Sequence, residues 1–138
     1  MEEKKTPKIP RGVVLTNGTI ADYWIDEGIL VSLSKNIRRT VPLIHENVAL
    51  VKMITGNKKM PLLIYLSKSP VPDKATRKLS TEMLPEIYSA MAMVAEPGLS
   101  YFIMKILFAL KPPPIPMKSF TSDEDAKKWL KQFVATSQ

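Results

Sequence analysis

The sequence predicts a single α/β domain in which a mixed sheet of four or five strands, with a β-hairpin at its N-terminal side, is flanked by helices. Short apolar runs alternate along the chain with segments of helical spacing, and this alternation is typical of a mostly parallel sheet. The length of 138 residues matches about one domain. A content of 45% hydrophobic and 24% charged residues is that of an ordinary globular protein.

The first part of the chain divides into a tail and a domain. Residues 1–18 are polar and are interrupted by prolines and glycines, so we expect a flexible N-terminal tail there. A short strand at residues 13–15 that joins this tail to the sheet is left open. The α/β domain itself is expected to occupy residues 19–138.

A β-hairpin is expected at the start of the domain. Residues 19–25 and 28–34 are rich in aromatic and β-branched side chains, which favour strands. Between them lie Asp26, Glu27 and Gly28. An acidic residue followed by glycine is typical of a tight hairpin turn, because such a turn needs positive φ.

Two helices are expected in the middle of the chain. The first begins at Thr40, which can cap it, and ends at Gly56 and Asn57, which accept the left-handed conformation. The second is capped by Asp73 and is expected to end near residue 83, because Pro85 separates it from the next segment.

Continuous apolar runs at residues 60–66 and 89–95 predict two adjacent parallel strands in the centre of the sheet. Residues 99–110 have a broad helical apolar stripe. The proline-rich segment at 111–116 excludes both a helix and a central strand. Residues 117–120 then predict a short edge strand.

A last helix is expected to follow this edge strand. Thr121 and Glu124 have the spacing of a capping box, which marks a helix start. One helical face, which we expect to point into the core, is formed by Ala126, Trp129, Leu130 and Phe133.

The composition argues against most enzymes. The chain has no cysteine, which excludes disulfides, thiolate metal sites and cysteine nucleophiles, and it has only one histidine, His45. There is no glycine-rich phosphate-binding loop. We therefore expect no catalytic residues, no metal and no cofactor.

The net charge of +7 is spread over short basic groups, so we do not expect nucleic-acid binding. The longest apolar stretch, residues 91–110, is interrupted by Glu96, Pro97 and Gly98 and contains Lys105. It therefore does not predict a transmembrane segment, and with no signal-like apolar region at the start we expect a cytoplasmic protein.

The best candidate for a binding site is the loop after the strand at 60–66. In parallel α/β sheets, ligands and partners meet the loops at the carboxyl ends of the strands. Here two serines, three cations and a helix start come together, a combination that suits an anion or an acidic protein surface. An ordinary strand-to-helix connection is the competing interpretation. The candidate residues are Ser67, Lys68, Ser69, Asp73, Lys74 and Arg77.

The helix expected at 99–110 has a second apolar face, formed by Tyr101, Met104 and Phe108. This face either is buried in the core or meets a second subunit or an apolar ligand. The sequence leaves both alternatives open.

Three segments resemble a family. These are YWIDEGILVSL at 23–33, LLIYLSKSPVPDKATRKL at 62–79 and, most specifically, KPPPIPMKSFTSDEDAKKWL at 111–130. They look like the uncharacterised bacterial STAS-like proteins, small domains similar in fold to the anti-sigma-factor antagonists and to the STAS modules of anion transporters. The resemblance spans about residues 19–134 and implies a mixed sheet flanked by helices, no catalytic residues, and a role in binding a protein or a small ligand.

One position departs from the pattern of the antagonists. In that family, a serine directly after an aspartate is phosphorylated at the start of the helix that follows the central strand. The matching pair here is Asp73 and Lys74, and a lysine cannot accept the phosphate. This puts the phosphorylation switch in doubt, and Ser69 and Thr76 are only neighbours of the site.

The resulting expectation is a non-enzymatic, cytoplasmic, bacterial STAS-like domain that acts through protein–protein contacts. Its protein partner is not identified, and a homodimer is left open. The alternative is a carrier or sensor of a small apolar or anionic ligand, bound between the helix at 99–110 and the sheet.

Overall fold

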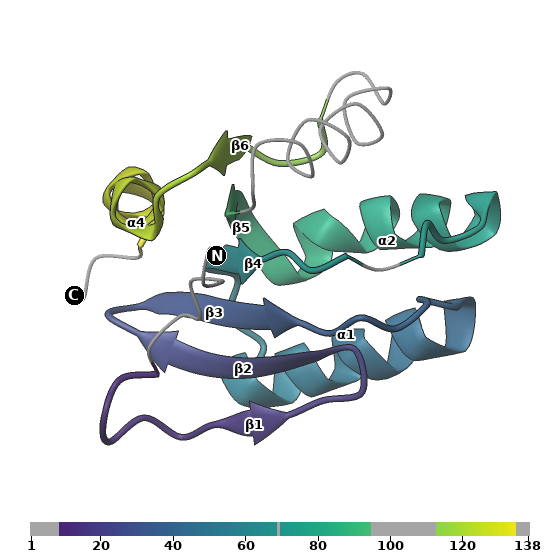
Figure 1. Cartoon of the computed structure of the whole chain (residues 1–138), viewed down its shortest axis with the longest axis horizontal. Helices are drawn as coiled ribbons and strands as arrows, with labels where there is room; N and C mark the ends of the chain where they lie inside the picture. The colour runs from purple at the N-terminus through teal and green to yellow at the C-terminus, as the bar shows by residue number, and fades with distance from the viewer. Residues whose placement is uncertain (1–8, 69, 95–112, 135–138) are drawn as a thin grey trace, which may run out of the picture.

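The computed structural model describes residues 9–68, 70–94 and 113–134. Within them, the strands form one mixed sheet in the order β1-β2-β3-β4-β5-β6 (Figure 1). The first three strands pair antiparallel, and β3 to β6 pair parallel. The strands are β1 (Thr16–Asn17), β2 (Ala21–Asp26), β3 (Ile29–Ser34), β4 (Met60–Tyr65), β5 (Tyr88–Val94) and β6 (Met117–Phe120).

Helices cover both faces of this sheet. On one face α1 and α2 lie side by side, and α4 packs on the other (Figure 1). A short 3-10 helix, η1, continues α4. The helices are α1 (Val41–Thr55), α2 (Lys74–Ile87), α4 (Asp123–Leu130) and η1 (Lys131–Phe133).

Successive side chains of the central strands enter two different cores. In β3, Leu30 packs under α1 and α2, whereas Ile29 and Val31 pack under α4. In β4, Leu62 and Leu63 divide in the same way. A strand buried on both faces is nearly all apolar, which explains the apolar runs at residues 60–66 and 89–95 of the sequence.

The expected fold class, central parallel strands and hairpin are confirmed. β4 and β5 are neighbours and parallel, and β2 and β3 form the antiparallel hairpin. The hairpin turn places Glu27 at φ 52° and Gly28 at φ 81°, which is the positive-φ pair that a tight turn requires.

Within the described residues the sheet has six strands instead of the expected four or five. The additional strand is β1, within the segment assigned to the tail, and it pairs Thr16 with Tyr23 and Asn17 with Asp22. Pairing therefore lies at Thr16–Asn17 and not at 13–15. Gly18 permits the tight return to β2, because a side chain there would meet the Ala21 carbonyl oxygen at 2.6 Å.

Two helix boundaries differ from the predicted ones. α2 continues through Pro85 to Ile87, because the lost N–H costs one helical hydrogen bond while Ile87 and Met83 pack into the core. The cap of α4 is Ser122 and not Thr121: the Ser122 hydroxyl accepts from the Asp125 N–H at 3.4 Å.

α1 has the predicted ends. Thr40 caps its start by accepting from the Leu43 N–H, and Gly56 closes it at φ 64°. The helix expected at 99–110 lies outside the described residues.

Candidate binding surface at the carboxyl edge of the sheet

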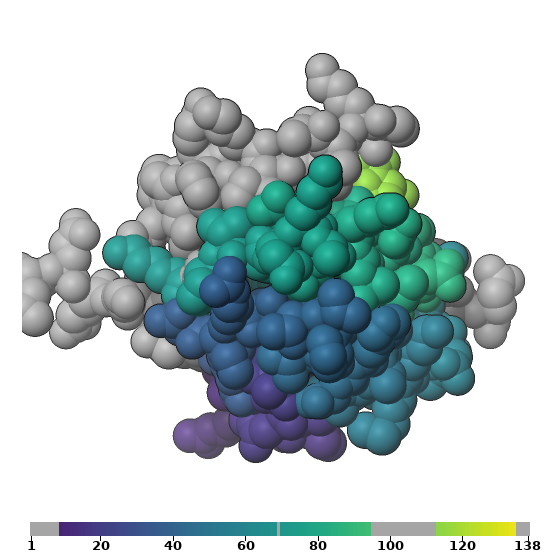
Figure 2. Space-filling view, turned by 90° about the vertical axis from the view of Figure 1, so that its right-hand side faces the viewer, coloured from purple at the N-terminus to yellow at the C-terminus, as the bar shows by residue number. Residues whose placement is uncertain are grey.

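The candidate loop lies where the parallel strands end. The segments that follow β3 and β4 lead directly into α1 and α2, so both helices begin at this edge of the sheet. Figure 2 looks onto this side of the molecule, where α1 (blue) and α2 (teal) lie against each other. We call this region the carboxyl edge and define it by residues 34–40, 66–68 and 70–77.

Hydrogen bonds tie the strand ends together. The Ser67 hydroxyl donates to the Ser34 hydroxyl oxygen at 3.4 Å, which links the ends of β4 and β3. The Leu66 N–H donates to the Val94 carbonyl oxygen at 3.0 Å, which links β4 to β5. Ser67 is half-buried and belongs to this framework, while Ser69 lies outside the described residues.

Arg39 holds the loop between β3 and α1. Its guanidinium donates to the carbonyl oxygens of Lys35 at 2.7 Å, Ile37 at 2.6 Å and Ile20 at 3.0 Å. It also donates to the Ser34 hydroxyl oxygen at 2.6 Å. Burial lowers the pKa of Arg39 from its ordinary value, since the charge is partly desolvated. The role of Arg39 is therefore structural.

Asp73 is the cap of α2. Its carboxylate accepts from the Thr76 N–H at 2.8 Å, and the helix begins at the next residue, Lys74. This hydrogen bond is the main reason that the pKa of Asp73 lies below its ordinary value, and the charges of Arg38 and Arg77 lower it further. Asp73 therefore shapes the edge and remains ionised near neutral pH.

The candidate cations have different roles. The Arg77 guanidinium donates to the Pro72 carbonyl oxygen at 3.0 Å, so it braces the loop. Lys68 and Lys74 are exposed, and neither forms an ion pair with a described residue. Arg38 is exposed as well, and its charge reaches Asp73.

The structure thus brings Arg38 to the candidate loop from a segment far away in the sequence. Neither Arg38 nor Arg39 is among the candidate site residues predicted from the sequence. The signal that identifies them is their position directly before Thr40, which caps a helix that must begin at the same edge as α2.

The possible apolar interface formed by Tyr101, Met104 and Phe108 lies outside the described residues. His45 is exposed on α1. The part of the chain that the structure describes contains no group of three or more acidic or histidine side chains placed to hold a metal ion. It also contains no helix that is long and apolar enough to span a bilayer.

The comparisons with known proteins agree with the fold. Residues 23–134 match the model of a domain family described as a domain of unknown function (DUF7793). A crystal structure of an uncharacterised DUF3478-family protein with a SpoIIAA-like fold, from Shewanella loihica PV-4, superposes with a TM-score of 0.51 at 15% identity, covering 86% of this chain and 92% of that one. No curated protein matches the sequence significantly. At this identity the structural likeness establishes the STAS-like fold alone.

Proposed function

The chain belongs to the DUF7793 family, and we propose that it is a regulatory binding module that acts without catalysis through its carboxyl edge. The observation that carries this proposal is the set of exposed cations around the starts of two helices, Arg38, Lys68 and Lys74. A partner with an acidic surface fits them best. We place this role in the bacterial cytoplasm, as the resemblance to the STAS-like proteins suggests.

The physical basis is electrostatic attraction at a rigid edge. The amino ends of α1 and α2 carry the positive ends of their helix dipoles, which add to the three cations. Charges at the rim of an interface mainly speed association, and salt screens them with a Debye length of about 8 Å at physiological ionic strength. The proposed recognition is therefore fast and sensitive to salt.

Lys74 suggests how this module differs from the antagonists it resembles. It stands where they carry a phosphorylated serine, and it supplies a permanent positive charge. We propose that recognition here does not wait for a phosphate. A single histidine and the absence of cysteine support a role without catalysis.

The test reverses the charge of two lysines at the carboxyl edge. The edge variant is Lys68→Glu with Lys74→Glu; Arg77 is left intact because its guanidinium braces Pro72. The matched control is Lys52→Glu with Lys128→Glu, which makes the same change of charge on exposed residues outside the carboxyl edge.

Proteins captured from a lysate are quantified by mass spectrometry at low and high salt. We expect a set of proteins that the wild type and the control capture at low salt and that the edge variant loses. Equal capture by the edge variant, or equal loss in the control, would contradict the proposal.

The carrier alternative concerns the helix expected at 99–110, outside the described residues, and it stays a prediction. Native mass spectrometry of freshly purified protein tests it, because a carrier retains its ligand and the same spectrum shows the number of copies. A homodimer would appear in that measurement.

A further inference from the structure

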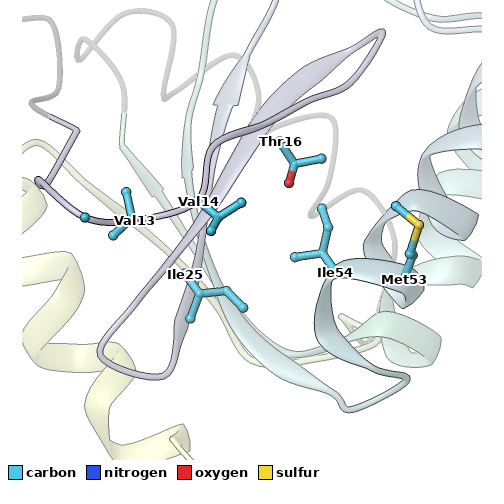
Figure 3. Close-up of a pocket in the computed structure, with 7 residues that line it drawn as sticks. Val13, Val14, Thr16, Ile25, Met53 and Ile54 are labelled. Carbon is cyan, nitrogen blue, oxygen red and sulfur yellow. The ribbon is translucent and has the colours of Figure 1, made fainter.

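An open groove lies at the other end of the sheet from the carboxyl edge. It has a volume of about 480 Å³ and runs between the segment that contains β1 and the last turns of α1. Val14, Thr16 and Ile25 form its sheet side, and Met53 and Ile54 of α1 form the opposite side (Figure 3). We call this feature the β1–α1 groove.

The groove continues into a second depression of about 350 Å³, and Ile25 lines both. Lys58, Lys59 and Met60 line this second part, at the start of β4. The combined surface is therefore apolar along its length and basic at one end.

The apolar side chains here are unusually exposed. Val14 is 81% exposed, Met53 71% and Ile25 39%. A single exposed apolar side chain is ordinary in a folded protein, whereas several gathered around one groove are a common feature of interaction sites.

The register of the sheet places the side chains of the groove on one face. Thr16 pairs with Tyr23, whose side chain lies in the core under α1, so Val14 and Ile25 point to this same face. α1 presents Met53 and Ile54 toward them (Figure 3). The space is bounded by a sheet on one side and a helix on the other, which is the setting for another helix packed beside α1.

Charge indicates what kind of helix fits. Lys58 and Lys59 are exposed, and neither forms an ion pair with a residue in the described ranges. The acids of the adjacent hairpin turn are already occupied: Asp26 pairs with Lys127 at 3.1 Å, and Glu27 pairs with Lys131 at 3.6 Å. The groove therefore presents positive charge beside apolar side chains.

We propose that the β1–α1 groove binds an amphipathic helix of a partner protein whose apolar ridge is flanked by aspartate or glutamate. Its apolar side chains cover Val14, Ile25 and Met53, and its carboxylates pair with Lys58 and Lys59. A second copy of this chain fits less well, because it would bring the same lysines against each other. This site is separate from the carboxyl edge and goes beyond the function proposed for it.

The test selects helical peptides on the full chain. A displayed library carries leucine, isoleucine or phenylalanine at i, i+3, i+4 and i+7 of about four helical turns, with glutamate and lysine randomised at the other positions. We expect the enriched peptides to be rich in glutamate.

Three variants locate the bound peptide. Met53→Lys, and separately Lys58→Glu with Lys59→Glu, should each weaken binding by about tenfold or more, the effect of removing a central contact. The control, Lys68→Glu with Lys74→Glu, should bind as the wild type does. Circular dichroism and thermal unfolding show that each variant is folded, as expected for exposed positions.

Four results would overturn the inference: no enrichment, enrichment of lysine-rich peptides, binding that Met53→Lys leaves unchanged, or concentration-dependent self-association that Met53→Lys abolishes. The last result, from sedimentation, would assign the groove to a second copy. Because the two lysine pairs lie at opposite ends of β4, failure here leaves the proposal for the carboxyl edge standing.

Discussion

At the residue scale, Arg38 and Arg39 show that neighbouring arginines can have different roles. Arg39 donates to four oxygens of the loops around β3, whereas Arg38 is exposed and its charge helps to lower the pKa of Asp73. A basic pair in a sequence is therefore not a single feature. Its second member holds the loop that presents the first.

Replacing Arg39 should destabilise the fold much more than replacing Arg38. Arg39→Ala leaves partly buried carbonyl oxygens without their donor, and we expect the free energy of unfolding to fall by about 2–4 kcal/mol. Arg38→Ala should change it by less than about 0.5 kcal/mol, as is usual for an exposed site. Urea denaturation of the pair measures both, and equal effects would contradict the assignment.

Two buried tyrosines should make the free energy of unfolding depend on pH in the alkaline range. Burial raises the pKa of Tyr23 and of Tyr88, and the Tyr23 hydroxyl donates to Asn47 at 2.8 Å. A raised pKa in the folded state means that only the unfolded chain releases these protons above about pH 10, so stability is full below this pH and falls as the pH rises further.

We therefore expect the urea midpoint to drop as the pH rises above about 10. The drop should be smaller in Tyr23→Phe with Tyr88→Phe, which has no buried phenol at these positions. Deprotonation of lysines affects both proteins alike, so the difference between them isolates the tyrosines. Identical slopes would show that the phenols ionise freely in the folded state.

At the element scale, α4 packs on the face of the sheet opposite α1 and α2, and one aromatic cluster contributes to this packing. The Trp129 ring lies 5.8 Å from Phe120 and 5.0 Å from Phe133, measured between centroids. The Tyr65 hydroxyl donates to the Asp123 carboxylate at 2.9 Å and fixes the start of this helix. Trp129 is only half-buried, so it contributes less than a fully enclosed aromatic side chain.

Trp129→Ala should lower the free energy of unfolding by about 2–3 kcal/mol, below the full range of about 3–5 kcal/mol for a buried aromatic residue. Lys128→Ala, on the exposed side of the same turn, is the control and should have little effect. Chemical denaturation with tryptophan-independent detection by circular dichroism gives both values. A change under about 1 kcal/mol would mean that α4 is held mainly by Ala126 and Leu130.

The elements that sequence reasoning predicted well are those with one dominant local cause. Thr40 and Gly56 define both ends of α1, and unbroken apolar runs define β4 and β5. The misplaced boundaries depend on tertiary packing instead. Pro85 stays within α2 because Ile87 is held in the core, and β1 exists because β2 offers a free edge.

At the scale of the whole molecule, the candidate site was predictable only in part. Its loop follows from the parallel topology, so Lys68, Asp73 and Lys74 were accessible from the sequence. The contribution of Arg38 and the use of Arg77 as a brace depend on contacts between loops that no local pattern records. The β1–α1 groove could not be predicted from the sequence. Val14, Ile25 and Met53 lie in three separate segments, expected as a tail, a strand and a helix, and only the tertiary structure brings them together.

Both proposed surfaces place exposed lysines on a chain that already carries a net charge of +7, which costs stability through repulsion. If these lysines serve binding and not folding, reversing them should not destabilise the protein. We expect Lys68→Glu with Lys74→Glu to raise the free energy of unfolding at low salt by up to about 1 kcal/mol, since a glutamate in the first turn of α2 also suits the helix dipole. Lys58→Glu with Lys59→Glu should be neutral or slightly stabilising.

Salt supplies the check on this interpretation. The difference between either variant and the wild type should shrink in about 1 M sodium chloride, where the Debye length is about 3 Å and exposed charges no longer interact. Urea denaturation at low and high salt measures it. A stability loss that persists in high salt would mean that the lysines hold the fold through their aliphatic stems, and the surfaces they form would then have a structural explanation in place of a functional one.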